Sequence, residues 1–250
     1  MSGRDEWHAL VAYTPARVAL GRVGNGLPTA RVLEFQLAHA RARDAVHAAF
    51  DARCVADELA IPGTLLLDTL AQNRESYLLS PDAGRRLDAP SRTKLQNGRF
   101  DAALVIADGL SATAIHRHGA RLARLILAGH SELNWTPVTI VTGGRVAIGD
   151  EIAQALGAEL CVVLIGERPG LSAADSIGIY VTFRPRSGVT TDAERNCISN
   201  VRPGGLALED AAHRLSWLLA EARRLRLTGV ELKEDAPVLH AVTDTAKLSG

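Results

Sequence analysis

The sequence predicts an α/β protein: a mainly helical N-terminal region (residues 1–100) followed by a Rossmann-like layered sheet domain (residues 101–250). Two observations support this division. Apolar residues recur at helical spacing in the first part of the chain. In the second part, short continuous apolar runs alternate with amphipathic stretches, which is typical of buried parallel strands joined by helices. The chain has 250 residues, enough for one large or two small domains.

Three helices are expected in the N-terminal region. The first covers residues 29–50 and begins at a threonine that can cap it. Residues 54–56 either continue this helix or start a new turn. A second helix is expected after a Pro-Gly pair, over residues 64–74, and a short third one over residues 91–97. Residues 79–87, which are rich in Pro, Gly and charge, are predicted to be irregular.

Four strands and three helices are predicted in the second part of the chain. Each strand is a short apolar run, and each helix carries its apolar residues at helical spacing. Glycines at positions 157 and 229 end the second and third of these helices. In chain order we expect a strand at 103–107, a helix at 113–128, a strand at 138–141, a helix at 150–156, strands at 160–165 and 177–183, and a helix at 208–227.

Composition excludes several classes of protein. Lysine plus arginine equals aspartate plus glutamate, at 28 each, so no global charge attracts nucleic acid or an anionic membrane. The three cysteines, Cys54, Cys161 and Cys197, have no paired spacing, which argues against a disulfide framework and a zinc site. Neither a secretory signal nor a membrane-spanning apolar run is recognisable. We therefore expect an intracellular protein of the reducing cytosol.

Asp108 and Ser111 lie between a predicted strand and a predicted helix. Ser111 is expected to cap the helix, while a ligand-facing role for Asp108 stays open. A serine triad is not expected, because Ser111 lacks the flanking glycines of a nucleophile elbow. His116 and His118, two residues apart on a helix, would point to different faces and cannot easily share a metal.

Two glycine-rich segments suggest phosphate loops at first sight. Residues 21–26 lack dinucleotide-binding spacing and precede a helical region, so a turn-rich connector is expected. Gly143-Gly144 follows a predicted strand and allows a close backbone approach to another surface, with Val146 as a small apolar contact. We interpret Asp150 and Glu151 as capping carboxylates, because acidic residues in the first helical turn suit the helix dipole.

Glu167 and Cys197 are the strongest remaining candidates. Glu167 follows a predicted strand, where open α/β sheets bind ligands, and is confined by Gly166 and an Arg-Pro-Gly turn. An ion pair with Arg168 is the structural alternative. Cys197 has no histidine nearby to act as a base, so packing against a ligand or a neighbouring subunit is favoured over nucleophilic catalysis. No complete catalytic set is recognisable, so the sequence looks like half of an active site.

These segments together resemble the small (light, β) subunit of ethanolamine ammonia-lyase, an adenosylcobalamin-dependent enzyme. The similarity extends over roughly residues 14–230, in the order of the family. The matching segments are TPARVALGR from Thr14, SPDAGRRL from Ser80, VIADGLS from Val105, GRV from Gly144, GERPGL from Gly166 and RNCISN from Arg195.

The resemblance implies that the C-terminal domain contributes to a cobalamin site at the interface with a large TIM-barrel subunit, in an oligomer of α and β pairs. Carried over by motif, the cofactor contacts would be Val146, Glu167 and Cys197. The reaction would convert ethanolamine to acetaldehyde and ammonia, with no catalytic residue and no cobalt-ligating histidine in this chain. The implied location is the cytoplasm. Packaging in a bacterial microcompartment stays open, because the segment before Thr14 is shorter than the packaging extension of some relatives.

Two other functions stay open on the sequence alone. One is a self-contained Rossmann-like enzyme acting on a nucleotide or a small acyl substrate, with Asp108, Glu167 or Cys197 in catalysis. The other is a purely structural subunit with a vestigial pocket. Activity without any partner would distinguish the first of these from a cofactor-binding subunit.

Overall fold

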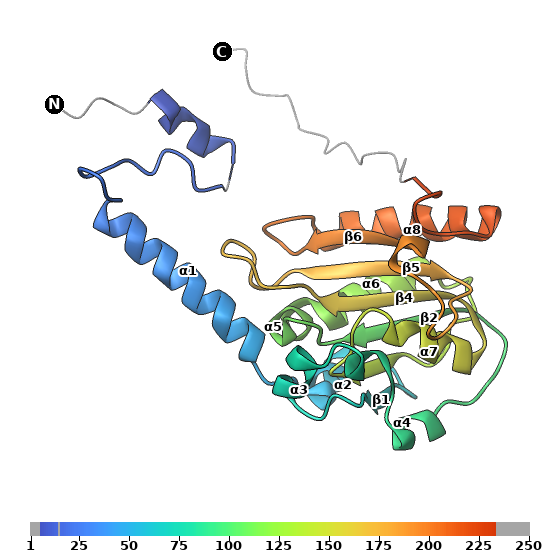
Figure 1. Ribbon diagram of the computed structural model, residues 1–250. Helices are drawn as coiled ribbons and strands as arrows, with labels where there is room; N and C mark the ends of the chain where they lie inside the picture. Colours follow the sequence, from blue (N-terminus) through green and yellow to red (C-terminus); the bar gives the residue numbers. More distant parts are fainter. Residues whose placement is uncertain (1–5, 15, 234–250) are drawn as a thin grey trace, which may run out of the picture.

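A six-stranded sheet forms the centre of the molecule in the computed structural model, which describes residues 6–14 and 16–233 (Figure 1). The strand order is β1-β3-β2-β4-β5-β6, and the first four of these are parallel, while β5 and β6 each run antiparallel to the preceding strand. The α/β class predicted from the sequence is confirmed. The strands are β1 (Leu65–Asp68), β2 (Phe100–Ala107), β3 (Thr139–Thr142), β4 (Ala158–Gly166), β5 (Ile177–Phe183) and β6 (Arg195–Val201).

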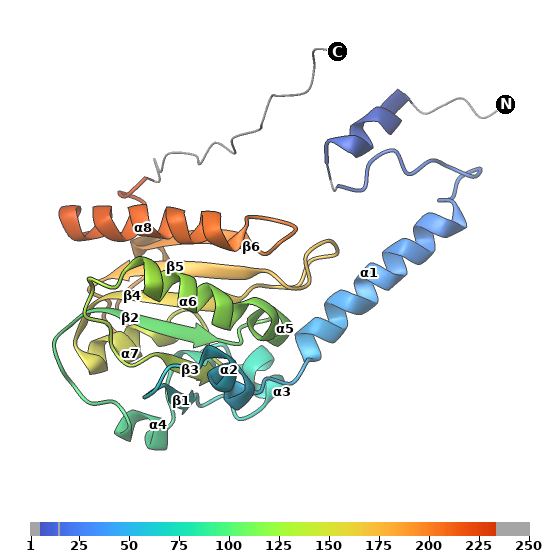
Figure 2. The same cartoon turned by 180° about the vertical axis from the view of Figure 1, so that it is seen from behind.

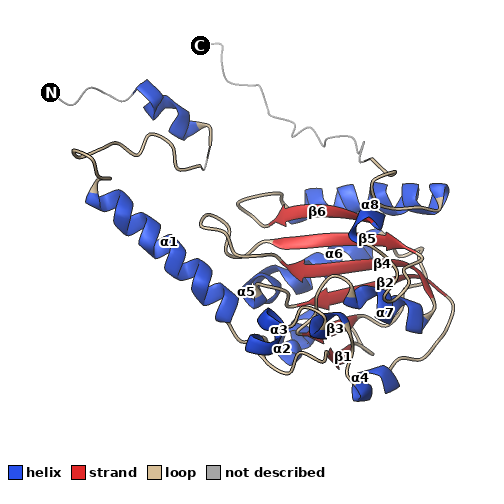
Figure 3. Cartoon of the chain, in the orientation of Figure 1, coloured by secondary structure: helices blue, strands red, loops and turns tan. Residues whose placement is uncertain are grey.

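Helices cover both faces of the sheet (Figures 2 and 3). One face is packed by α2 (Ala52–Leu59), α6 (Ala120–Gly129) and α8 (Leu208–Leu225). These helices form the larger apolar core with the sheet, to which β1 contributes the partly buried Leu66. The other face is packed by α7 (Ile148–Leu156), which lies mainly on β2 and β4. Because α7 covers only this part, the same side of β5 and β6 is left open.

The remaining elements are short, apart from α1 (Thr29–His47). This helix projects away from the layered body in both views (Figures 1 and 2). The short elements are η1 (Glu6–Ala12), α3 (Arg74–Leu79), η2 (Ala83–Arg85), α4 (Ala89–Thr93), α5 (Ala112–Ala114), the π-helical turn η3 (Ile115–Gly119) and η4 (Asp192–Glu194). No helix within the described residues combines the length and the apolar character needed to cross a membrane.

The elements predicted for the second part of the chain are confirmed within a few residues, but Gly229 does not end the last helix. That helix, α8, ends at Leu225, and Arg226 takes the left-handed cap position. Gly157 adopts the left-handed conformation and ends α7, as its position predicted. Ser111 accepts a hydrogen bond from the Ala114 N–H, so the predicted cap is also confirmed. The predicted helix over residues 113–128 is present from Ala112 to Gly129 but includes the π-helical turn η3.

The helix predicted over residues 64–74 is wrong. Its Leu65-Leu66-Leu67 segment is β1, which pairs in parallel with β3 from Leu65 opposite Thr139 to Asp68 opposite Thr142. A short apolar run fits a buried strand and a helix equally well, and pairing with a distant strand decides between them. β1 therefore lies in the same sheet as the strands of the second part of the chain.

Two other boundaries differ from expectation. The first helix ends at His47 rather than at residue 50, and α2 follows as a separate helix, because the Asp51 side chain caps it by accepting from the Arg53 and Cys54 N–H groups. Strand β6 was not predicted. Its mixed polar sequence gives no apolar run, since it is an edge strand paired only with β5.

Candidate functional site

Two adjoining cavities lie on the open side of the sheet, beside α7. The smaller has a volume of about 440 Å³ and the larger about 930 Å³, and Arg145, Val146 and Tyr180 line both. The smaller one is bordered by the loops that follow β2, β3 and β4, which contribute Leu110, Val146 and Glu167. The carboxyl ends of parallel strands are where open α/β sheets bind ligands, so this position agrees with that rule.

The backbone of the loop after β3 is held in place by the buried carboxylate of Asp108. Asp108 Oδ1 accepts a hydrogen bond from the Gly144 N–H at 3.1 Å, and Gly143 has a φ of +69°, which favours glycine. The next residue, Arg145, donates its N–H to Gly84 O at 2.8 Å. These contacts fix the backbone on both sides of the turn and thereby present Val146, which is half-buried, to both cavities.

Asp108 is a positioning residue in this geometry and lines neither cavity. Burial raises its pKa from 3.8 to about 6, against the opposing effects of the Arg74 guanidinium and of hydrogen bonds from Gly144, Gly143 and Gly109. Arg74 Nη1 lies 3.8 Å from Asp108 Oδ2. The ligand-facing role that the sequence left open is therefore not supported.

We expect Asp108 to make the protein less stable as the pH rises through about 6. The folded state holds the Asp108 proton more tightly than the unfolded chain does, so the contribution is fully present below pH 3.8 and is lost as the pH rises through the folded pKa of about 6. The difference between the two pKa values corresponds to a decrease of about 3 kcal/mol in the free energy of unfolding over this pH range. Asp108→Asn should remove this dependence, measured as the free energy of urea unfolding at several pH values between 4 and 7.

The matched control for this measurement is Asp57→Asn, at an exposed position of α2. Its pH profile should follow that of the unaltered chain. A profile for Asp108→Asn that is parallel to the unaltered one would show that Asp108 titrates like an exposed carboxylate.

Glu167 is held in a fixed position at the end of β4. Its N–H donates to Ser176 O at 3.0 Å, and its Oε2 accepts from the Asn200 N–H at 3.1 Å. Arg168 is exposed and forms no ion pair with Glu167 in the described part of the chain, so the structural alternative is not observed. The carboxylate thus bridges the end of β4 to the end of β6, and Glu167 lines the smaller cavity.

Cys197 lies directly opposite Tyr180 in the β5–β6 pair, and both point to the open side of the sheet. The Tyr180 and Cys197 side chains are therefore neighbours on this side. Desolvation raises the pKa of the Cys197 thiol; the Tyr180 hydroxyl opposes this, and the Glu167 carboxylate adds to it. Cys197 is therefore a neutral thiol at pH 7, which disfavours the nucleophile hypothesis.

Two of the three residues suggested by motif line one cavity, and the third lies beside a residue that lines it. Val146 and Glu167 line the smaller cavity, and Cys197 adjoins it through Tyr180. Sequence reasoning missed Tyr180, although a signal exists. In the predicted strand the apolar residues Ile177, Ile179 and Val181 occupy every second position, and Tyr180 occupies a position between them. Successive side chains of a strand point to opposite faces, so Tyr180 must lie on the face opposite these apolar side chains.

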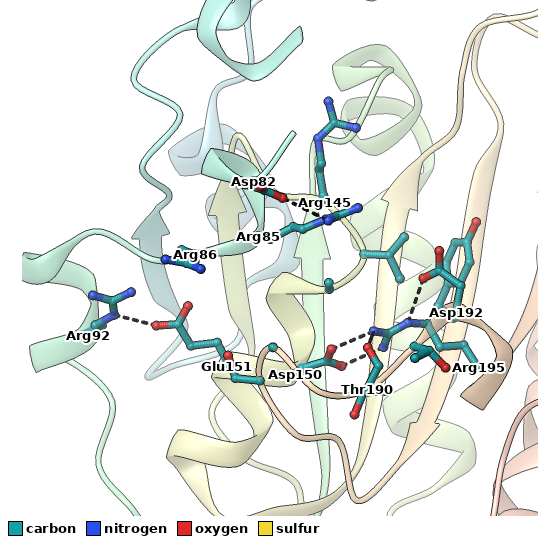
Figure 4. A pocket seen from close by; sticks show the side chains of 16 residues that line it. Asp82, Arg85, Arg86, Arg92, Arg145, Asp150, Glu151, Thr190, Asp192 and Arg195 are labelled. Atoms are coloured by element: carbon teal, nitrogen blue, oxygen red, sulfur yellow. Dashed lines mark hydrogen bonds and ion pairs between the residues drawn. The ribbon is translucent and has the colours of Figure 1, made fainter. Parts of the chain in front are cut away.

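The larger cavity is lined by charged residues of both signs (Figure 4). Asp150 and Arg195 form a buried two-point ion pair in which both N–O distances are 2.7 Å. Glu151 accepts from the Leu87 N–H at 3.0 Å and pairs with Arg92. Asp150 and Glu151 do lie in the first turn of α7, but neither caps it, so the capping interpretation is wrong. Their partners are distant in sequence and could not be inferred from it.

The other candidates have structural roles. The His116 ring accepts a hydrogen bond from the Asp51 N–H at 3.0 Å, whereas His118 lies 3.4 Å from Asp175, so the two do face different ways. Residues 21–26 form a tight turn closed by a bridge between Val23 and Gly26, as expected for a connector. Within the described residues there is no cluster of three or more His, Cys, Asp or Glu side chains able to hold a metal ion.

Comparisons with known proteins point to one family. The model of the family described as "Ethanolamine ammonia-lyase light chain" matches residues 4–233. The chain is similar to the ethanolamine ammonia-lyase small subunit of Xanthomonas campestris pv. campestris (strain B100), with 52% identity over 97% of this chain and 93% of that protein. Those of Ralstonia nicotianae and Azotobacter vinelandii are each 51% identical, over 94% of this chain and 90% of each relative.

Proposed function

Because this chain belongs to the ethanolamine ammonia-lyase light-chain family, whose members are small subunits of a carbon–nitrogen lyase, we propose how it works in that enzyme. It holds one edge of adenosylcobalamin against a large subunit, and the assembled enzyme converts ethanolamine to acetaldehyde and ammonia. The observation that carries the proposal is the open surface where Val146, Glu167 and the Tyr180–Cys197 pair meet without a catalytic set.

The residues present fit such a cofactor. Cobalamin is far larger than a drug-sized ligand, and its corrin edge carries amide groups that both donate and accept hydrogen bonds. The two cavities share one wall and are open, which suits a ligand covered only in part by this chain. Arg145 Nε is buried without a hydrogen-bond partner beside the smaller cavity, and an acceptor on the ligand would satisfy it.

Each residue contributes a different contact in this proposal. Glu167 Oε2 is occupied by the Asn200 N–H, so the remaining oxygen accepts from an amide N–H of the ligand. Val146 packs against the apolar edge of the ligand, on a loop fixed by Asp108. Cys197, a neutral thiol beside Tyr180, packs without reacting.

When bound, adenosylcobalamin supplies the radical that removes a hydrogen atom from the substrate. The residues of this chain bind, orient and shield the ligand edge. They include no acid–base pair aimed into the smaller cavity, where Glu167 is committed to Asn200. We therefore expect the chain to be inactive on its own and the substrate to be bound by the large subunit.

The test combines purified chain and large subunit and measures adenosylcobalamin-dependent release of acetaldehyde, together with the affinity for the cofactor. Glu167→Ala should weaken cofactor binding about tenfold, because a charged hydrogen bond contributes about 1.5 kcal/mol, and Cys197→Ala should weaken it about threefold. Glu209→Ala and Cys54→Ala, at exposed positions of α8 and α2, are the matched controls.

Three outcomes would contradict the proposal. Acetaldehyde release by this chain alone would favour a self-contained enzyme. Unchanged cofactor affinity in both site variants would remove Glu167 and Cys197 from the site, and full activity of the large subunit without this chain would leave it a structural role only.

A further inference from the structure

Helix α1 has almost no packing partner among the residues that the structure describes. Of its 19 residues only Ala45 is buried, and the helix extends away from the layered body in both views (Figures 1 and 2). Most helical stability in proteins comes from tertiary packing of one face, and α1 lacks such packing here. A helix so exposed is therefore expected to pack against a partner that is not among the described residues.

The exposed apolar side chains of α1 lie on opposite faces. Leu33 and Leu37 are one turn apart on one face and are 59% and 52% exposed. Phe35, which is 45% exposed, lies about 200° around the helix from Leu33. A helix that rests on a flat surface needs only one apolar stripe, whereas a helix that is apolar all round is buried. The missing partner thus encloses α1 on more than one side.

The base of α1 is fixed to the candidate site. Arg74 Nε donates to Val46 O at 2.5 Å and its Nη1 donates to Gly109 O at 2.7 Å, beside Asp108. Just after the helix, the Asp51 N–H donates to His116, and Phe50 stacks on the same ring at 5.3 Å between centroids. The C-terminal end of α1 therefore lies at the carboxyl ends of the parallel strands (Figure 1). The loops that follow these strands also line the smaller cavity.

We propose that α1 is a docking arm that inserts into an apolar groove of the large subunit. This inference rests on the proposed function and adds to it the surface by which the two subunits join. Arg74 joins the end of α1 to the loop that contributes Leu110 to the smaller cavity, so one partner can cover both. Residues 16–47 contain five arginines against Glu34 and Asp44, so the groove is expected to have an acidic rim.

A second copy of this chain is the less favourable occupant. Two arms packed together would place the same excess of arginine side by side, which costs energy at an interface. A large subunit of different sequence is free to provide complementary charge. The geometry therefore favours a heteromeric contact.

The experiment uses the full-length chain carrying Leu33→Glu and Leu37→Glu together, with Phe35→Glu as a second variant on the opposite face. Affinity for the purified large subunit is measured by sedimentation, and folding by circular dichroism. We expect the double variant to bind at least about 100-fold more weakly, because two leucines lose their burial, with an unchanged unfolding midpoint. Val230→Glu is the matched control, since Val230 is 76% exposed and its backbone bonds to Ala193 at the opposite edge of the sheet.

The possible outcomes distinguish a failure of the docking inference from a failure of the proposed function on which it rests. If the unaltered chain binds and activates the large subunit and both α1 variants do so with unchanged affinity, the docking arm is wrong while the proposed function stands. If the variants lose only self-association of this chain, a second copy is the occupant and the inference is overturned. If the unaltered chain neither binds nor activates the large subunit, both proposals fail.

Discussion

Replacing Arg195 with leucine should lower the free energy of unfolding by about 3–5 kcal/mol, which is typical for the removal of one partner of a buried ion pair. The Arg195 and Asp150 side chains are only 3% and 2% exposed, so Asp150 would be left as an uncompensated charge between α7 and β6. Urea unfolding at pH 7 measures the loss. The loss should shrink as the pH is lowered, because burial already raises the pKa of Asp150 and a protonated carboxyl needs no countercharge.

Asp192→Ala is the matched control for Arg195→Leu. Its carboxylate also lies near Arg195, at 3.4 Å, but is 95% exposed, so its removal should cost less than about 1 kcal/mol. The double variant Asp150→Leu with Arg195→Leu should recover most of the stability, since apolar residues often replace a buried pair without loss. Equal losses for Arg195→Leu and Asp192→Ala would show that the buried pair contributes no more than a surface contact.

Gly166→Ala is expected to displace the site more than any change to a side chain at its rim. A Cβ at this position would lie 2.5 Å from Asp108 O and closer still to Ser111 O, and both are backbone atoms that cannot rotate away. Overpacking of this kind costs about 1–3 kcal/mol and moves the backbone. Because Glu167 is the next residue, cofactor affinity in the assembled enzyme should fall at least as much as it does in Glu167→Ala.

Gly170→Ala provides the comparison within the same loop. A Cβ there would meet nothing closer than Ala173 O at 3.8 Å, an ordinary contact. Stability and cofactor affinity should stay unchanged in this variant. If Gly166→Ala leaves stability and cofactor affinity unchanged, as expected for Gly170→Ala, the loop after β2 can move away from a Cβ at position 166 without cost, and the expected overpacking is wrong.

Local patterns were sufficient to predict most of the sheet. β2, β4 and β5 are continuous apolar runs because helices or neighbouring strands bury them, and such runs are visible without knowledge of their partners. β1 and β6 could not be predicted in this way. The sequence of β1 fits a helix as well as a strand, and only its pairing with β3 decides between them. β6 is an exposed edge strand, and its residues are held in strand conformation only by pairing with β5.

The site was predictable only in part. The positions of Val146 and Glu167 at strand ends follow from the sequence, and their proposed role came from resemblance to a family. The Tyr180–Cys197 contact depends on the register of two antiparallel strands, and the Asp150–Arg195 pair joins residues 45 positions apart. Contacts of this kind depend on the three-dimensional arrangement of the chain, which local hydrophobic periodicity does not predict.

The Arg74 side chain contacts both the proposed docking helix α1 and the loop after β2 beside the candidate site. These two contacts restrict which substitutions position 74 can accept in evolution. Its guanidinium donates from separate nitrogens to α1 and to the loop after β2, and it lies over the Tyr77 ring at 4.8 Å. A lysine has a single ammonium group without this planar fork and cannot make the same set of contacts. Substitutions at this position would therefore be selected against for two reasons at once, so the helix and the loop are expected to diverge together among relatives rather than independently.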